Sequence, residues 1–166
     1  MKHSKNLLFS LFLIVSIGFV SCGNQKIVSS IQTNAIKVMH VPEGSPNGES
    51  WDPFGSGLPD VQLKISNESG ILYSSETYDD ASSKNIYMFK EKNPFMFTDL
   101  NTEYRIDVYD IDDLSADEWL GGFKFTPADF KDQKEILLTS STTPIEITLL
   151  VDWNYIKKKD ALKPSK

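Results

Sequence analysis

Short runs of alternating apolar and polar side chains recur between residues 35 and 152, and polar turns separate them. The alternation is clearest in the runs 105–109 and 146–151, where every second side chain can face a core. No long helical period interrupts these runs. The pattern predicts eight strands, at 35–41, 61–65, 71–75, 86–89, 95–98, 104–109, 119–125 and 145–152.

The connections between these runs are rich in turn-forming residues. The longest of them, 42–59, holds four prolines and four glycines, and the segments 67–70 and 110–117 are short and polar. A helix is expected only at 127–134, where Pro127 suits a first helical turn. Short strands joined by such turns predict an all-β fold, an eight-stranded antiparallel β-sandwich.

The chain of 166 residues has room for one domain, which we expect at 34–156. Residues 22–33 are small and polar, which favours a flexible tether. The lysine-rich segment 157–166 is expected to be a disordered basic tail. A domain of this size buries roughly two-thirds of its unfolded surface, which is enough for a core without disulfides.

The N-terminal segment carries the features of a sorting signal. Lys2 and Lys5 precede an apolar stretch of 14 residues, 7–20, that is too short to cross a bilayer comfortably. Small residues follow this stretch, so we expect residues 1–21 to be a signal peptide that is removed from the mature protein.

The run 19–23 contains the single cysteine of the chain, Cys22, and resembles the lipobox of bacterial lipoproteins. The resemblance implies cleavage before Cys22 and attachment of lipid, palmitate included, at that residue. The protein would then be anchored in the cell envelope on a bacterial membrane, with the outer membrane as the expected one. An ordinary secretory signal followed by a free thiol is the alternative.

Charge and composition exclude some classes of function. Loss of residues 1–21 removes Lys2 and Lys5 and takes the formal net charge from −6 to −8, so nucleic acid is a poor partner. After cleavage His40 is the one histidine, and no cysteine is placed to serve as a nucleophile, which disfavours a Ser-His-Asp or Cys-His catalytic site. We therefore expect a protein that is not an enzyme.

The acidic side chains gather in two turns, 51–60 and 109–121, rather than along strand faces. If both turns lie at one end of the sandwich, like charges in contact repel by up to roughly 4 kcal/mol at an effective dielectric of about 20. Ca²⁺ would neutralise them, because it takes about six to eight oxygen ligands from flexible loops. The turns hold neither histidine nor cysteine, which argues against zinc and copper.

The segments 58–65 and 108–112, followed by 118–121, resemble the acidic loops and adjoining strands of the C2 domain. The segment 149–153 is similar to the final strand of many members. C2 domains are β-sandwiches whose loops hold Ca²⁺ and often meet phospholipid. The resemblance implies five calcium ligands, Asp52, Asp60, Asp110, Asp112 and Glu118, with Asp117 as an alternative to Glu118.

Two functions fit this pattern best. The first is a membrane-anchored, non-catalytic Ca²⁺-binding module that takes an anionic ligand, such as a lipid headgroup or a polysaccharide, or a protein partner. The second is a metal-free structural or protein-interaction sandwich of the cell envelope, because Asp and Ser are also common in turns that only meet solvent. A hydrolase that uses paired carboxylates is disfavoured, because so small a domain offers little cleft.

Three aromatic residues flank the acidic turns. Trp51 and Phe54 lie in the first turn, where a ligand contact and a place in the core are equally open. Trp119 adjoins a predicted strand, which favours a place in the core.

Overall fold

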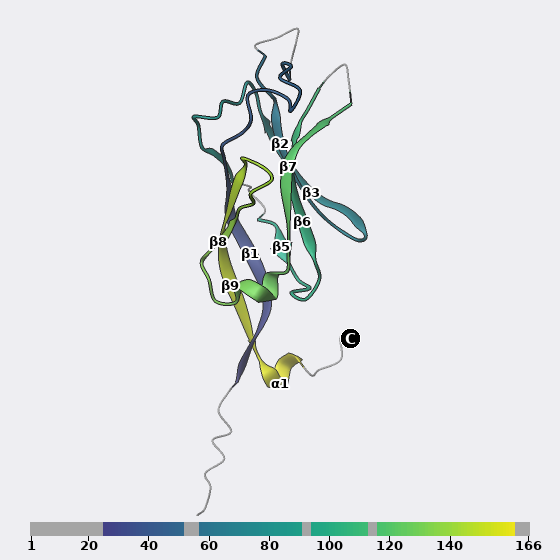
Figure 1. Cartoon of the computed structure of the whole chain (residues 1–166). Helices are drawn as coiled ribbons and strands as arrows, with labels where there is room; N and C mark the ends of the chain where they lie inside the picture. Colours follow the sequence, from purple (N-terminus) through teal and green to yellow (C-terminus); the bar gives the residue numbers. More distant parts are fainter. Residues whose placement is uncertain (1–24, 52–56, 91–93, 113–115, 162–166) are drawn as a thin grey trace, which may run out of the picture.

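The computed structural model describes residues 25–51, 57–90, 94–112 and 116–161 of the chain. Within them, two antiparallel β-sheets pack face to face around one apolar core (Figure 1). This architecture confirms the all-β antiparallel sandwich that the side-chain pattern predicts.

The first sheet consists of four strands, and each neighbouring pair is antiparallel. Their order is β3 (Gly70–Tyr78), β2 (Val61–Asn67), β6 (Tyr104–Asp110) and β7 (Glu118–Phe125). In β2, Val61, Leu63 and Ile65 are fully buried, while the side chains between them are half-buried on the outer face. Burial of each such side chain stabilises the fold by about 1.5–3 kcal/mol, which explains why the alternating pattern selects this register.

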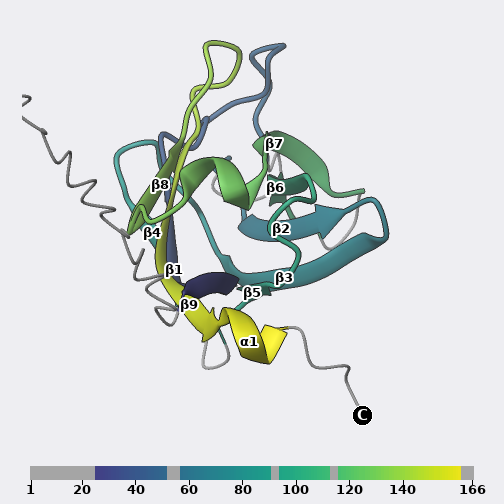
Figure 2. The same cartoon turned by 90° about the horizontal axis from the view of Figure 1, so that it is seen from below.

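The second sheet is built on two long strands. Its path is β4 (Tyr87–Phe89), β1 (Lys26–Met39), β9 (Glu146–Lys157) and β8 (Glu135–Leu138), and β5 (Met96–Phe97) also pairs with β1. Because β9 covers one edge of β1 along its whole length, β4 and β5 share the other edge at different heights. The nine strands of the described residues therefore fill eight positions, four in each layer, and Figure 2 shows the two layers from below.

One strand, β8, is absent from the sequence prediction. Where a helix is expected at 127–134, the structure has a short 3-10 helix, η1 (Pro127–Phe130), and β8 follows it. The pattern does not reveal β8, because Leu137 is 54 % exposed and the strand reads as a run of apolar residues instead of an alternation. Ile136 and Leu138 are the side chains of β8 that face the core.

The pairing of β1 with β9 extends further than the sequence indicates. It runs from Lys26 opposite Lys157 to Met39 opposite Glu146, and Ile31 within it is fully buried. The prediction of a flexible tether at 22–33, with the domain starting at 34, is therefore wrong for residues 26–33. The strand that stabilises these residues lies near the other end of the sequence, so their local composition does not reveal it.

The C-terminal boundary also moves. β9 ends at Lys157 and residues Lys158–Ala161 form the short helix α1, so the tail predicted at 157–166 is wrong for 157–161. The backbone N–H of Lys158 donates to the carbonyl of Gln25 at 2.8 Å, which ties α1 to the start of β1. Residues 162–166, the predicted signal peptide 1–21, Cys22 and residues 23–24 lie outside the described residues. Neither η1 nor α1, the two helices in the described ranges, is long and apolar enough to cross a membrane.

Candidate functional site

The two acidic turns meet where β2 begins and β6 ends, in the upper part of Figure 1. The backbone N–H of Ile111 donates to the carbonyl of Asp60 at 2.9 Å, so the residues next to the two strands are joined directly. β7 starts on the other side of β6, with Glu118 opposite Asp110. We refer to the group of carboxylates at this place, Asp60, Asp110, Asp112 and Glu118, as the acidic end.

Asp110 is the most buried member of the acidic end, at 1 % exposure. Its Oδ1 accepts the backbone N–H of Asp60 at 2.6 Å, whereas its Oδ2 is buried without a hydrogen-bond partner among the described residues. The pKa of this carboxyl is raised from 3.8 to about 6, chiefly because burial disfavours the charged form. At neutral pH the protein therefore holds a buried negative charge that is only half paired.

The other three carboxylates of the acidic end lie close enough to Asp110 for their charges to repel its own. The charges of Asp112, Asp60 and Glu118 all raise its pKa, and only the hydrogen bond from Asp60 lowers it. Oδ1 of Asp60 itself accepts the backbone N–H of Asp80 at 2.9 Å. Glu118 is exposed, while Asp60 and Asp112 are half-buried. The structure thus brings together four of the five residues that the C2 resemblance implies as ligands.

Asp52, the fifth of those residues, lies outside the described residues, as does Phe54. Asp117, the alternative to Glu118, is engaged elsewhere, because its Oδ2 accepts a hydrogen bond from Nζ of Lys64 at 2.6 Å. That ammonium group also lies 4.6 Å from the ring centre of Tyr109, on the outer face of the sheet. Asp117 therefore has a cation of its own.

The described residues do not form a complete metal centre by themselves. Within the four described ranges, no three His, Cys, Asp or Glu side chains are arranged so that they could hold a metal ion. The donor set nevertheless fits a hard cation, since every candidate ligand is a carboxylate. The unpartnered Oδ2 of Asp110 is the atom that such a cation would satisfy.

The two tryptophans that flank the acidic turns, Trp51 and Trp119, take opposite places. Trp51 is 6 % exposed, and its Nε1 donates to the carbonyl of Pro42 at 2.8 Å, which supports the core alternative for this residue. Trp119 is 53 % exposed, so the expectation that it lies in the core is wrong. An irregularity in the pairing of β6 with β7, between Val108 and Tyr109, places one additional residue of β7 there and shifts the alternation of this strand.

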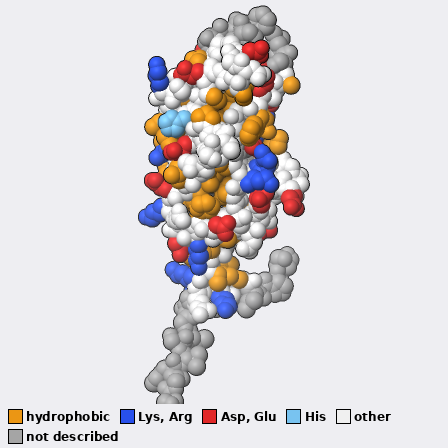
Figure 3. Space-filling model, in the orientation of Figure 1, with side chains coloured by type: hydrophobic (Ala, Val, Ile, Leu, Met, Phe, Trp, Pro, Cys, Tyr) orange, Lys and Arg blue, Asp and Glu red, His pale blue; other side chains and the backbone are white. Residues whose placement is uncertain are grey.

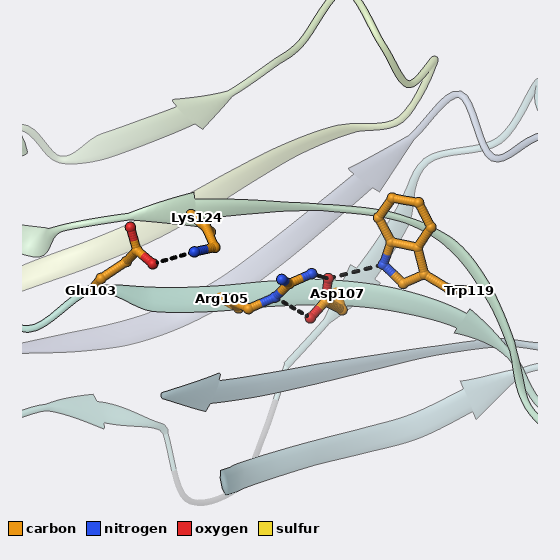
Figure 4. A network of polar contacts seen from close by, with 5 residues as sticks. All are labelled: Glu103, Arg105, Asp107, Trp119 and Lys124. Atoms are coloured by element: carbon orange, nitrogen blue, oxygen red, sulfur yellow. Dashed lines mark hydrogen bonds and ion pairs between the residues drawn. The ribbon is translucent and has the colours of Figure 1, made fainter. Parts of the chain in front are cut away.

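A buried charge on the outer face of β6 does not follow from the pattern alone. Asp107 is 5 % exposed and is held by Arg105, with Nε at 3.1 Å from Oδ2 and Nη2 at 2.9 Å from Oδ1. Nε1 of Trp119 also donates to Oδ1 at 2.9 Å (Figure 4). On β7, a Cβ at Gly122 would clash with Oδ1 of Asp107. Two consecutive glycines in a strand are the sequence signal for such a close approach.

Comparisons of sequence and of structure give different results. A scan against protein-family models finds no match, and a search of curated proteins finds none. Among solved structures, a C2 domain matches with a TM-score of 0.50 and 15 % identity, over 75 % of this chain and 96 % of that one.

Two structures of human GIVD cytosolic phospholipase A2 are also similar. One matches with a TM-score of 0.52 at 12 % identity over 75 % of this chain. The other, in complex with methyl γ-linolenyl fluorophosphonate inhibitor and terbium chloride, matches with a TM-score of 0.51 at 17 % identity over 78 % of this chain. The chain spans 16 % and 18 % of the length of these two chains. At such identities the likeness concerns the fold, and this chain is a C2-like β-sandwich.

Proposed function

We propose that this chain is a membrane-anchored, non-catalytic module that binds Ca²⁺ at its acidic end. The anchor in this proposal is lipid on Cys22. The observation that carries the calcium site is Oδ2 of Asp110, a buried carboxylate oxygen with no hydrogen-bond partner in the described part of the chain. A charge in such a place destabilises the fold unless a cation or a proton compensates it.

The residues of the acidic end suit calcium better than other metals. Asp110 and Asp60 would be the central ligands, with Asp112, Glu118 and Asp52 completing the set. Calcium accepts irregular sets of about six to eight oxygen ligands, whereas magnesium requires near-ideal octahedral geometry and keeps more of its water. The C2-like fold supports the proposal, because it joins the start of β2 to the end of β6.

A bound Ca²⁺ would offer open coordination positions to an anionic ligand. A lipid headgroup, a polysaccharide or an acidic protein segment each carries the oxygen atoms that such positions take. An exported module of this kind functions with dissociation constants of about 0.1–1 mM. We therefore expect weak binding.

Thermal unfolding with and without calcium tests this proposal. A ligand that binds only the folded state, present at roughly ten times its dissociation constant, adds about 1.4 kcal/mol of stability. For a domain of this size that raises Tm by about 4–6 °C. The measurement is a differential scan in chelator and in about 5 mM Ca²⁺, a concentration above the expected dissociation constant.

Two variants make the test specific. Asp110→Asn removes one ligand charge and should abolish the rise in Tm. Asp129→Asn makes the same chemical change in η1, at the opposite end of the sandwich, and should keep the rise. A wild-type Tm that does not respond to calcium, or a response that Asp110→Asn retains, contradicts the calcium site.

A metal-free interaction domain is the second candidate, and two contacts favour it. The carboxylate of Asp60 already accepts the N–H of Asp80, and that of Asp117 already pairs with Lys64, as in an acidic surface that is satisfied internally. In that case partner binding would weaken with salt and would not respond to chelator.

A further inference from the structure

The end of the molecule opposite the acidic end has a composition of its own. There β1 begins, β9 ends and α1 follows, as Figure 2 shows from below. We refer to this region as the basal end, made up of Lys26, Ile27, Tyr155, Ile156, Lys157 and Lys158. Figure 3 shows basic and hydrophobic side chains together at this narrow lower end.

The basal end presents cations on a protein that is otherwise acidic. Lys26 lies directly opposite Lys157 in the β1–β9 register, and Lys158 follows at once; all three are exposed. Like charges directly opposite each other across two strands are destabilising, so an anionic partner would relieve this pair. Asp160 is the one acidic residue of α1.

Apolar side chains are exposed beside these lysines. Ile27 lies opposite Ile156, and the two are 37 % and 38 % exposed. Tyr155 is 45 % exposed, and its hydroxyl donates to Asp132. Tyrosine and lysine next to aliphatic side chains are typical of surfaces that lie at a membrane–water boundary.

The proposed anchor lies close to this surface in the sequence. Cys22 precedes Lys26 by four residues, which span at most about 14 Å. The acidic end is much further away, because β1 runs from the basal end to Met39 and its 14 residues extend about 45 Å.

We propose that the basal end lies on the anionic bilayer that holds the lipid anchor, and that the acidic end points away from this bilayer. The proposal rests on the anchor of the proposed function. It reduces the set of possible calcium-dependent ligands, since headgroups of the anchoring bilayer are out of reach of the acidic end. The ligand is then an anion on the side away from this bilayer, such as a polysaccharide.

Energy transfer to headgroup-labelled vesicles tests the orientation. In the lipidated full chain Cys22 is blocked, so an introduced cysteine is the only free thiol that can be labelled. A dye at Ala161→Cys, beside the basal end, should transfer strongly to an acceptor whose transfer distance is about half the length of β1. A dye at Asn47→Cys, beyond the Met39 end of β1, should transfer weakly. Equal transfer from both sites, or stronger transfer from position 47, overturns the orientation.

Charge variants test the role of the lysines. Each lysine near an anionic surface contributes roughly five-fold in affinity, so Lys26→Gln with Lys157→Gln should lower transfer from position 161 in vesicles that contain phosphatidylglycerol. The same pair of changes should have no effect in pure phosphatidylcholine. Lys84→Gln with Lys90→Gln, away from the basal end, is the matched control. Loss of transfer in both kinds of vesicle, or in neither, overturns the proposal.

Failure of the anchor and failure of the orientation give different results. A chain that does not float with vesicles lacks the lipid anchor, and the orientation fails with it. A chain that floats but shows equal transfer from both dyes keeps the anchor and loses only the orientation. The calcium site is measured separately, by Tm.

Discussion

Strand β6 buries two aspartates, and their surroundings differ. Asp107 is 5 % exposed, and both of its oxygens accept hydrogen bonds, from Arg105 and Trp119. Asp110 is 1 % exposed, and only its Oδ1 is paired. Folding alone gives both oxygens of Asp107 a hydrogen-bond donor, whereas Oδ2 of Asp110 is left without one among the described residues.

The alternation of side chains explains the difference. Asp107 lies on the outer face of the sheet, where long polar side chains from the same face can reach it. Asp110 has the same parity as Ile106 and Val108, which are fully buried, so its carboxylate lies at the edge of the core. Buried charges are stable only when they are paired, and for this reason the proposed calcium site is centred on the half-paired carboxylate.

Removal of the partner of Asp107 should have the largest effect. Arg105→Ala leaves a buried charge with only the indole N–H of Trp119, and we expect a loss of about 2 kcal/mol in the free energy of unfolding. This value is below that of a fully buried pair, because the Arg105 side chain is 46 % exposed. Urea unfolding at pH 7 measures it, with Arg105→Lys as an intermediate control. A loss under about 0.5 kcal/mol would show that Asp107 behaves as a surface charge.

Removal of the negative charge of Asp110 itself should change the free energy of unfolding in the opposite direction. Without calcium, Asp110→Asn removes an unfavourable buried charge while its amide oxygen can still accept the N–H of Asp60. A rise in pKa from 3.8 to about 6 corresponds to about 3 kcal/mol at neutral pH, at 1.36 kcal/mol per unit. The new amide N–H₂ lacks a partner and offsets part of this gain, so we expect stabilisation by about 1–2 kcal/mol in urea unfolding with chelator. A clear loss of stability would mean that the carboxylate is paired in solution.

The pH dependence sharpens the same contrast. Because the folded state holds the Asp110 proton more tightly than the unfolded state, its contribution to stability is present at low pH and is lost as the pH rises through about 6. The calcium-free wild type should therefore gain stability relative to Asp110→Asn as the pH falls from about 7 to about 4. The variant serves as the reference, because Glu43 and Asp99 have lowered pKa values from serine and threonine hydrogen bonds and act in the opposite direction. Parallel pH curves for the two proteins would contradict the raised pKa.

The smallest effect is expected at the exposed pair on the same face of the sheet. Nζ of Lys124 lies 2.7 Å from Oε1 of Glu103, but both side chains are more than half exposed (Figure 4). A double-mutant cycle with Lys124→Met and Glu103→Gln should give a coupling below about 0.5 kcal/mol. A larger coupling would extend the Asp107 network to the start of β6.

The period-two alternation is strong enough to predict the sandwich. Runs such as Val61, Leu63 and Ile65 place one apolar side on a core, and turn residues separate the runs. The acidic turns are equally visible, and their junction follows from the C2 resemblance. The start of β1 is not visible, because Lys26 to Thr33 gain their stability from β9, far away in the sequence.

The sequence by itself therefore determined the fold class and the presence of two acidic turns, because both depend on local order along the chain. Only the tertiary structure decided which carboxylate is satisfied and which is not. That Trp119 faces outward and donates to Asp107 depends on the irregularity in the pairing of β6 with β7. Oδ2 of Asp110 has no hydrogen-bond donor among the described residues because of the way β2 pairs with β6. Burial and hydrogen bonding depend on neighbours in space, which the sequence alone does not show.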